Sequence, residues 1–197
     1  MKPVSLVGGG GHARVVIGIL RALSQPILGI FDDDESVQGS LVLGIEVLGR
    51  VSDAEGHAVL AIGDNRTRQF LSSRCGLTWV SLVHPSAWVD PTVLIGEGVV
   101  VCAGAVIQPE SKIGSHSIIN TSATVDHECT LEDCTQIAPG ANLGGRVRVG
   151  EGAFVGIGSS VIQGVKLGSW SIVGAGAAVI EDVPSGVTVI GVPARSR

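Results

Sequence analysis

The chain of 197 residues is long enough to bury one large core or two small ones. Apolar residues make up 45% and charged residues only 16%, a balance that excludes a disordered chain. The formal net charge of -5 argues against a nucleic-acid partner, and no apolar stretch approaches the roughly 20 residues needed to cross a bilayer. Because no signal-peptide pattern follows Met1, we expect a soluble cytoplasmic protein with no membrane partner.

The four cysteines, at positions 75, 102, 129 and 134, form no C-x-x-C pair. This spacing does not indicate a metal site or a redox motif. We therefore expect free thiols in a reducing compartment.

Residues 1–80 alternate between predicted strands and helices. Val4–Val7 predicts a short buried strand, and a helix with periodic apolar residues follows it to about Leu23. Ile27–Phe31 and Ala58–Ile62 predict two further strands, and a helix containing Arg66 and Arg68 follows the second of these. The alternation predicts a small Rossmann-like parallel βαβ domain over residues 1–80.

Glycines fill the first turn of this domain. Gly8, Gly10 and Ala13 fit the pattern G-x-G-x-x-G/A, and the N-terminus of the helix behind them can hold a diphosphate. A plain tight turn would use the same glycines. Two features favour a nucleotide: Asp32 and Asp33 follow the second strand, where a ribose or base is read, and the domain is too short for a complete dinucleotide fold. We therefore expect a nucleotide sugar rather than NAD(P).

Residues 81–197 repeat with a period of six. The aliphatic positions are Val83, Val89, Ile95, Val101, Ile107, Ile113, Ile119, Val125, Leu131, Ile137, Leu143, Val149, Val155, Val161, Leu167, Val173 and Val179. A small residue stands four places after each, and Gly often follows the aliphatic residue directly, where we expect it to relax the turn. Each hexad predicts one short strand and one turn in a stacked parallel β-helix. The pattern resembles the hexapeptide-repeat family, which implies left-handed coils of three hexads.

One turn of this β-helix carries a candidate base. His127 stands between Asp126 and Glu128 at an outward corner position, and a neighbouring carboxylate can orient an imidazole and raise its basicity. Gly145 follows eighteen residues later, one coil along at the same corner, with a backbone N–H that can polarise a thioester carbonyl. A solvated turn histidine is the alternative. A base beside an oxyanion donor is what acyl transfer requires.

Short motifs spread over almost the whole chain carry a wider resemblance. They are Gly8–Ala13, Ile62–Asn65, Val83–Ala87, Asn120–Ser122, His127–Cys129 and Gly191–Ala194. Together they resemble the bacterial sugar O-acyl/N-acetyltransferase family that includes the PglD, NeuD and PerB types. The resemblance implies a homotrimer that binds acetyl-CoA between adjacent prisms, needs no metal, and holds a nucleotide-linked amino sugar in its N-terminal domain.

The resemblance also implies roles for individual residues. His127 would be the general base with Glu128 as its partner, Gly145 would contact the acetyl carbonyl, and Asn120 would orient the substrate. The residues implied to line the channel for acetyl-CoA are Gly145, Gly156, Ile157 and Gly158. Those implied to hold the nucleotide are Gly8, Gly10, Gly11, His12, Asp32, Asp33 and Asn65.

One position departs from the family pattern. Members commonly carry a second histidine nine residues after the base, where this chain has Gln136. The Gln136 amide can form a hydrogen bond with the substrate but cannot titrate, so the acid–base role of His127 becomes more important. His84 and His116 lack a comparable polar setting, and we interpret them as structural.

The sequence thus predicts an acetyl-CoA-dependent N-acetyltransferase acting on the amino group of a nucleotide-activated 4-amino-deoxy sugar, such as a UDP- or GDP-linked one. O-acetylation of sialic acid or a related sugar is the nearest alternative, because it uses the same scaffold. A non-catalytic nucleotide-sugar-binding protein is the alternative from another class. The nucleotide base, the acceptor's stereochemistry and the glycan pathway stay open.

Overall fold

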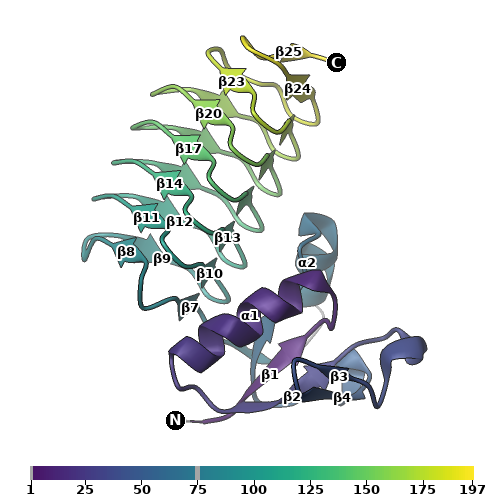
Figure 1. Ribbon diagram of the computed structural model, residues 1–197. Helices are drawn as coiled ribbons and strands as arrows, with labels where there is room; N and C mark the ends of the chain where they lie inside the picture. The colour runs from purple at the N-terminus through teal and green to yellow at the C-terminus, as the bar shows by residue number, and fades with distance from the viewer. Residues whose placement is uncertain (1, 74–75) are drawn as a thin grey trace.

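The computed structural model describes residues 2–73 and 76–197. It consists of an α/β sheet at the N-terminus and a three-sided prism of stacked coils that rises beside it (Figure 1). The cysteine at position 75 lies outside the described residues, and the thiols at positions 102, 129 and 134 are free and buried. Within the described ranges, no helix is long and apolar enough to cross a membrane.

The N-terminal sheet has six strands in the order β3-β4-β2-β1-β5-β6. Its strands are β1 (Val4–Val7), β2 (Ile27–Phe31), β3 (Leu41–Val42), β4 (Ile45–Gly49), β5 (His57–Leu60) and β6 (Thr78–Trp79). Its helices are α1 (Gly11–Ala22), α2 (Asn65–Ser72) and the short 3-10 turns η1 (Glu35–Val37) and η2 (Val51–Asp53). All neighbours pair in parallel except β3 and β4. The predicted Rossmann-like βαβ order is confirmed, and β3, β4 and β6 are additional strands.

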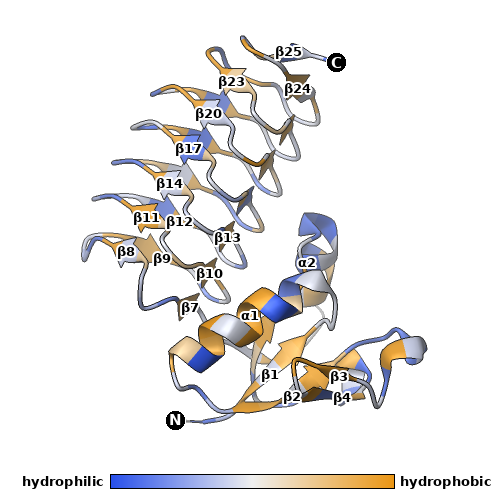
Figure 2. Cartoon of the chain, viewed as in Figure 1, coloured by the Kyte–Doolittle hydropathy of each residue, from blue (hydrophilic) through white to orange (hydrophobic). Residues whose placement is uncertain are grey.

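Helix α1 lies between this sheet and the prism. Its apolar residues Val16 and Leu20 belong to one buried cluster with Ile30 of the sheet and with Val100 and Ile118 of the prism. Figure 2 shows the helix as apolar over most of its length. Because one helix contributes to both cores, the N-terminal sheet is fixed against the first coils of the prism.

The prism is built from seventeen two-residue strands, each six residues after the last. They are β7 (Leu82–Val83), β8 (Trp88–Val89), β9 (Leu94–Ile95), β10 (Val100–Val101), β11 (Val106–Ile107), β12 (Lys112–Ile113), β13 (Ile118–Ile119), β14 (Thr124–Val125), β15 (Thr130–Leu131), β16 (Gln136–Ile137), β17 (Asn142–Leu143), β18 (Arg148–Val149), β19 (Phe154–Val155), β20 (Ser160–Val161), β21 (Lys166–Leu167), β22 (Ile172–Val173) and β23 (Ala178–Val179). The final hairpin, β24 (Thr188–Ile190) and β25 (Arg195–Ser196), closes the C-terminal end.

Every third strand belongs to the same face of the prism. Face 1 contains β7, β10, β13, β16, β19, β22 and the final hairpin; face 2 runs from β8 to β23; face 3 runs from β9 to β21. Val100 pairs with Ile118, so one coil takes eighteen residues. In each strand the second residue is the aliphatic one, and from Val101 onward all of these are buried. The predicted left-handed parallel β-helix is confirmed.

The turns at the corners correct one expectation. The residue with a left-handed backbone stands three places after the aliphatic one, as at Glu128 (φ 58°), and not directly after it. Gly156, which does follow the aliphatic residue directly, is there for space, because a Cβ would lie 2.5 Å from the carbonyl oxygen of Val173. The recurrent glycine therefore lets coils approach each other rather than relaxing the turn.

Candidate active site

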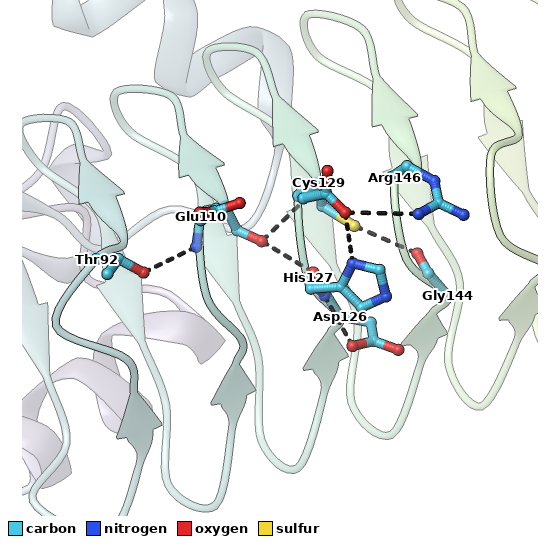
Figure 3. A network of polar contacts seen from close by, with 9 residues as sticks. Thr92, Glu110, Asp126, His127, Cys129, Gly144 and Arg146 are labelled. Atoms are coloured by element: carbon cyan, nitrogen blue, oxygen red, sulfur yellow. Dashed lines mark hydrogen bonds and ion pairs between the residues drawn. The ribbon is translucent and has the colours of Figure 1, made fainter.

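The base predicted from the sequence projects from the corner between faces 2 and 3. His127 stands in the turn between β14 and β15, and its backbone N–H donates to the Asp126 carboxylate at 2.7 Å. Figure 3 shows His127 and Cys129 on one coil, with Gly144 and Arg146 on the next. The imidazole is about half exposed, with 45% of its side chain accessible. The backbone of His127 is thus fixed, and its imidazole is accessible to a substrate.

The neighbouring carboxylate fixes which ring nitrogen carries the proton. Nδ1 of His127 lies 2.9 Å from Oε2 of Glu128. An ionised carboxylate only accepts hydrogen bonds, so Nδ1 is the donor and the neutral ring presents Nε2 as the acceptor. Nη1 of Arg146 forms an ion pair with the same Glu128 oxygen at 3.5 Å. The arrangement orients a proton acceptor outward.

Gly145 lies directly against the imidazole. A Cβ at this position would be 2.5 Å from Nε2 of His127, a distance that side chains do not occupy. The coil alignment explains the contact, since Arg146 N donates to the carbonyl oxygen of His127 at 2.9 Å. In the described part of the chain, the Gly145 N–H donates to no acceptor. The residues predicted as base and oxyanion donor are therefore adjacent.

A thiol stands at the same corner without taking part in this arrangement. Cys129 is fully buried, and its Sγ donates to the carbonyl oxygen of Gly144 at 3.3 Å. Burial raises the pKa of this thiol to about 11. It therefore stays protonated at neutral pH and is unsuited to act as a nucleophile.

Six of the predicted nucleotide residues line a single pocket of about 330 Å³ at the carboxyl ends of β1, β2 and β5. They are Gly8, Gly10, Gly11, His12, Asp32 and Asp33. Gly8 adopts a φ of 105°, which favours glycine, while Gly10 and Gly11 would find no neighbour within 4 Å of an added Cβ. Helix α1 starts at this turn with no side-chain cap and no acidic residue in its first turn. These features suit a bound diphosphate.

The two predicted acidic residues also hold the pocket's own loops in place. Oδ2 of Asp32 accepts the Gly9 N–H at 2.6 Å, and Oδ1 of Asp33 accepts the Val51 N–H at 3.0 Å. Oδ1 of Asp32 also accepts the Asp34 N–H at 2.9 Å, so both oxygens of Asp32 bind loop backbone, whereas Asp33 keeps a second oxygen that can bind a ligand. The acids therefore shape the pocket as well as facing into it.

His12 is the titratable group in this pocket with the largest change. Burial, and then the positive charge of Arg68, lower its pKa from 6.5 to about 4. Its Nε2 is buried and has no hydrogen-bond partner among the described residues. The ring is neutral at physiological pH and is a candidate hydrogen-bonding group for a ligand rather than a cation.

Two residues of α2 connect this pocket to the corner between faces 3 and 1. Arg68 is 1% exposed, and its guanidinium donates to the carbonyl oxygens of Ile62 and Gly63 on the pocket side. The acceptors on the prism side are the carbonyl oxygens of His116, Cys134 and Thr135. Sequence inspection gave Arg68 no role, because nothing in a helical pattern signals that five carbonyl oxygens will surround one side chain.

Asn65 was predicted in the nucleotide pocket, but the structure places its side chain toward the prism. Its Nδ2 donates to the carbonyl oxygens of Gly152 and Ala153 at 3.0 and 3.2 Å. Asn65 lines a second hollow of about 280 Å³, which shares Gly63 with the nucleotide pocket and is closed on the prism side by Phe154, among others. Asn65 thus lies between the pocket of the N-terminal sheet and the β-helix.

Gln136 stands on face 1 beside this second hollow. It pairs in register with Phe154, it is 9% exposed, and its Oε1 has no partner among the described residues. A buried acceptor without a partner costs free energy unless a ligand or water supplies a donor. The predicted substrate-contacting role of Gln136 fits this position, which is on a different face from His127.

The remaining predicted residues lie at the corner between faces 1 and 2. Asn120 uses its side-chain oxygen to accept the Thr121 N–H at 2.8 Å, and Gly156, Ile157 and Gly158 follow two coils further on. Ile157 is 60% exposed. A single chain therefore does not bring these four residues together with His127. His84 binds its own turn through Ser86, and His116 is buried against Trp79.

A β-helix with a histidine–carboxylate pair at one corner, preceded by a Rossmann-like sheet with a glycine-lined pocket, defines an acyltransferase of the hexapeptide-repeat class. Residues 3–75 match the model of the PglD N-terminal domain. Over 213 residues, the chain is 30% identical to GDP-perosamine N-acetyltransferase from Escherichia coli O157:H7, covering 99% of this chain and 96% of the relative. The chain belongs to the PglD/PerB-like acetyltransferase family.

Two solved structures extend this likeness to the whole chain. PerB from Caulobacter crescentus, in complex with CoA and GDP-perosamine, is 43% identical with a TM-score of 0.94 and covers 100% of this chain and 98% of its own. The acetyltransferase domain of PglB from Neisseria gonorrhoeae FA1090, in complex with acetyl coenzyme A, is 37% identical with a TM-score of 0.91, covering 99% and 98%. Both likenesses span the sheet and the prism together.

Proposed function

We propose that this protein is an N-acetyltransferase that moves the acetyl group of acetyl-CoA onto the amino group of a nucleotide-activated amino-deoxy sugar. The observation that carries the proposal is the hydrogen-bonded pair of His127 and Glu128 held against Gly145. The family relationship supports the donor and the acceptor class, since its characterised members include GDP-perosamine N-acetyltransferases.

The geometry of the corner supports a specific division of labour. As the sugar amine attacks the thioester carbonyl, Nε2 of His127 takes the proton that the nitrogen loses. The Gly145 N–H donates to the carbonyl oxygen as negative charge develops on it. When the C–S bond breaks, the protonated His127 returns its proton to the departing thiolate. Glu128 stabilises the imidazolium between these two steps.

A GDP-linked 4-amino sugar is the acceptor that we propose to test first. The relatives aligned over nearly their whole length in Escherichia coli and Caulobacter crescentus act on or bind GDP-perosamine. In this chain the glycine turn would hold the diphosphate, and Asp32 and Asp33 would hold the ribose or the base. The sugar would then extend past Gly63 into the second hollow, toward Asn65 and Gln136.

We further propose that the enzyme is a cytoplasmic homotrimer whose active sites lie between subunits. The predicted residues support this, because His127 projects from one corner while Asn120, Gln136 and the nucleotide pocket belong to other parts of the same chain. The outer side chains of face 2 are uncharged, which suits burial against neighbouring copies; they are Trp88, Val106, Thr124, Asn142, Ser160 and Ala178.

The domain division at residues 80 and 81 stays a prediction.

A substrate comparison tests the proposed function. The purified protein is given acetyl-CoA with GDP-, UDP- or dTDP-linked 4-amino sugars or with sialic acid, and release of the CoA thiol is followed. We expect turnover with an amino sugar, best with the GDP form, and acetylation on nitrogen by mass spectrometry of the product. Turnover with sialic acid alone would establish the O-acetyltransferase alternative. Nucleotide binding without acetyl-CoA binding would identify a non-catalytic protein.

A further inference from the structure

A buried column of side chains stands behind the corner that carries His127. Its members precede the strands of face 3 at intervals of eighteen residues, and they are Val93, Ser111, Cys129, Val147 and Val165. From Ser111 onward they are buried, with at most 5% exposed. Ser111 and Cys129 are the two that can donate a hydrogen bond from a side chain. The column is therefore polar only beside the reactive turn.

Both polar side chains of the column donate to backbone carbonyl oxygens of the next coil. Oγ of Ser111 donates at 2.8 Å to the carbonyl oxygen that directly precedes His127. Sγ of Cys129 donates at 3.3 Å to the one that directly precedes Gly145, which is the carbonyl oxygen of Gly144 (Figure 3). Oγ of Ser111 also accepts the N–H of Cys129 at 3.2 Å, which links the two. The column thus holds the backbone at the base and at the predicted oxyanion donor.

The prism folds without this contact in its later coils. Val147 follows Cys129 in the column and cannot donate. Among the described residues, no side chain donates to the carbonyl oxygen of Ile162, which has the corresponding place one coil after Gly144. Ser117 makes the same kind of contact, but at the corner between faces 3 and 1. The fold therefore does not require a hydrogen-bond donor at position 129.

The contact of Cys129 determines where the Gly145 N–H points. The peptide between Gly144 and Gly145 is trans, so its C=O and N–H bonds lie in one plane and point in opposite directions. The Gly144 carbonyl points inward to the buried thiol, and the Gly145 N–H therefore points outward. On that side lies the imidazole of His127, since a Cβ on Gly145 would be 2.5 Å from its Nε2. The thiol thus directs this N–H toward the place where the base acts.

Glycine on both sides leaves this peptide with little restraint of its own. Gly144 and Gly145 lack a Cβ, so the backbone bonds that flank the peptide are permissive. Neither position accepts a stiffer residue, because a Cβ would lie 2.7 Å from the backbone nitrogen of Gln163 at the first and 2.5 Å from His127 at the second. Rotation of the peptide would turn the N–H away from the corner. A hydrogen bond to the carbonyl oxygen restrains that rotation.

Cys129 is in the form that this contact needs. Burial raises the pKa of its thiol to about 11, so the sulfur keeps its proton at neutral pH. A hydrogen bond to a carbonyl oxygen also polarises the peptide, which makes its N–H a stronger donor. The contact therefore both restrains the peptide and strengthens the Gly145 N–H.

We propose that Cys129 is a positioning residue for acetyl transfer, whose thiol keeps the Gly145 N–H directed at the carbonyl oxygen of the thioester. The inference rests on the proposed function, which puts the thioester at this corner. Negative charge develops on that oxygen only as the amine attacks, so a donor held in place beforehand lowers the barrier more than it strengthens binding. Cys129 is fully buried and acts through the peptide, not on the substrate itself.

Two substitutions of Cys129 separate the hydrogen-bond donor from the space that the side chain fills. Cys129→Val removes the donor with a residue type that the column already holds at positions 147 and 165. We expect its kcat to fall about tenfold, less than the ~100-fold that complete loss of an oxyanion donor costs. Its KM values for acetyl-CoA and the nucleotide sugar should stay within about twofold, because the donor acts in the transition state. Cys129→Ser supplies the contact that Ser111 makes and should keep kcat within about twofold of the wild type.

Ser117→Val is the matched control at the corner between faces 3 and 1. Oγ of Ser117 donates to the carbonyl oxygen of Glu132 at 3.2 Å, and Val99 stands at the equivalent position one coil earlier. This variant should keep the wild-type kcat, because its contact lies at another corner. An equal fall in kcat in Ser117→Val would indicate a general loosening of the prism and overturn the proposal. A wild-type kcat in Cys129→Val, or a Cys129→Ser variant that is as slow, would overturn it as well.

Crystal structures of the two Cys129 variants test the restraint without turnover. In Cys129→Val we expect the Gly144 carbonyl oxygen to leave its inward position and the Gly145 N–H to turn from the corner. In Cys129→Ser both should stay in place. A peptide that does not move in Cys129→Val would overturn the proposal. A peptide that turns only in Cys129→Val, in a protein that acetylates no sugar, would contradict the proposed function and still support the restraint by Cys129.

Discussion

Two corners of the same prism differ in their role, because one is open and the other is covered by a helix. From residue 98 to residue 176, each corner has one residue per coil with a left-handed backbone, such as Glu128 at φ 58° between faces 2 and 3 and Cys134 at φ 55° between faces 3 and 1. The first corner is open, and His127 extends from it with 45% of its side chain exposed. The second is covered by α2, whose Arg68 is 1% exposed. At the open corner a side chain is accessible for chemistry, whereas at the covered corner backbone carbonyl groups accept hydrogen bonds from Arg68.

The difference shows what the repeat specifies and what it leaves free. The six-residue period sets where each turn lies, so His127 and Gly145 meet because they are eighteen residues apart. What a turn does depends on whether another part of the chain packs on it. Arg68 turns the covered corner into a joint between the nucleotide pocket and the prism, with acceptors on both sides.

The open corner should govern the rate and not the fold. Changing His127 to Ala should lower kcat by about 10²- to 10⁴-fold, the usual contribution of a general base. The free energy of unfolding should change by less than about 0.5 kcal/mol, because the side chain is about half exposed and lies in a surface turn. Steady-state kinetics and urea unfolding measure the two effects. The control is His84→Ala, a turn histidine that binds only Ser86 and should keep full activity.

The covered corner should govern stability. Changing Arg68 to Ala should lower the free energy of unfolding by about 3–5 kcal/mol, because several buried carbonyl oxygens lose their donor. Arg66→Ala is the matched control on the same helix. Its guanidinium lies over the Trp170 ring at 4.5 Å but is exposed, so its loss should cost only about 0.5–1 kcal/mol. Equal losses in the two variants would contradict the proposed joint.

His12 should make the stability of the folded protein sensitive to acid. Its pKa is about 4 when folded and 6.5 in its ordinary state, so the unfolded chain binds the additional proton between these values. Stability from the neutral ring is fully present above pH 6.5 and is lost as the pH falls through 4, by about 3 kcal/mol in total. His12→Gln should flatten the dependence of unfolding free energy on pH in this window. An unchanged slope would show that His12 titrates normally.

Glu128 should have the smallest effect of these four residues. Changing it to Gln keeps an oxygen acceptor for the Nδ1 proton of His127 but removes the charge that stabilises the imidazolium. We expect about a tenfold lower kcat in steady-state kinetics, because the imidazolium formed during transfer loses its counter-charge. Full activity in this variant would mean that the carboxylate does not act on His127.

Local and periodic features were predictable from the sequence, and contacts between distant segments were not. The β-helix register and the proximity of His127 and Gly145 follow from counting by six and eighteen. The glycine turn likewise marked the pocket that Gly8 and Asp32 line. The family resemblance placed Asn65 in that pocket, yet its amide binds carbonyl oxygens 87 and 88 residues away. Nothing in the sequence pointed to Arg68, because its partners are backbone carbonyl groups, which every residue carries.

We propose that acetyl transfer takes place at His127 on a sugar held by another subunit's nucleotide pocket. The most direct test mixes two inactive chains: His127→Ala, which keeps the pocket, and Gly10→Glu, whose carboxylate would fill the open space beside the glycine turn and repel a diphosphate. Coexpressed in equal amounts, they should regain about a quarter of the wild-type activity, since in a random trimer about one interface in four combines an intact base with an intact pocket. Mixed assemblies that stay inactive would contradict the account, because each site would then belong to a single chain.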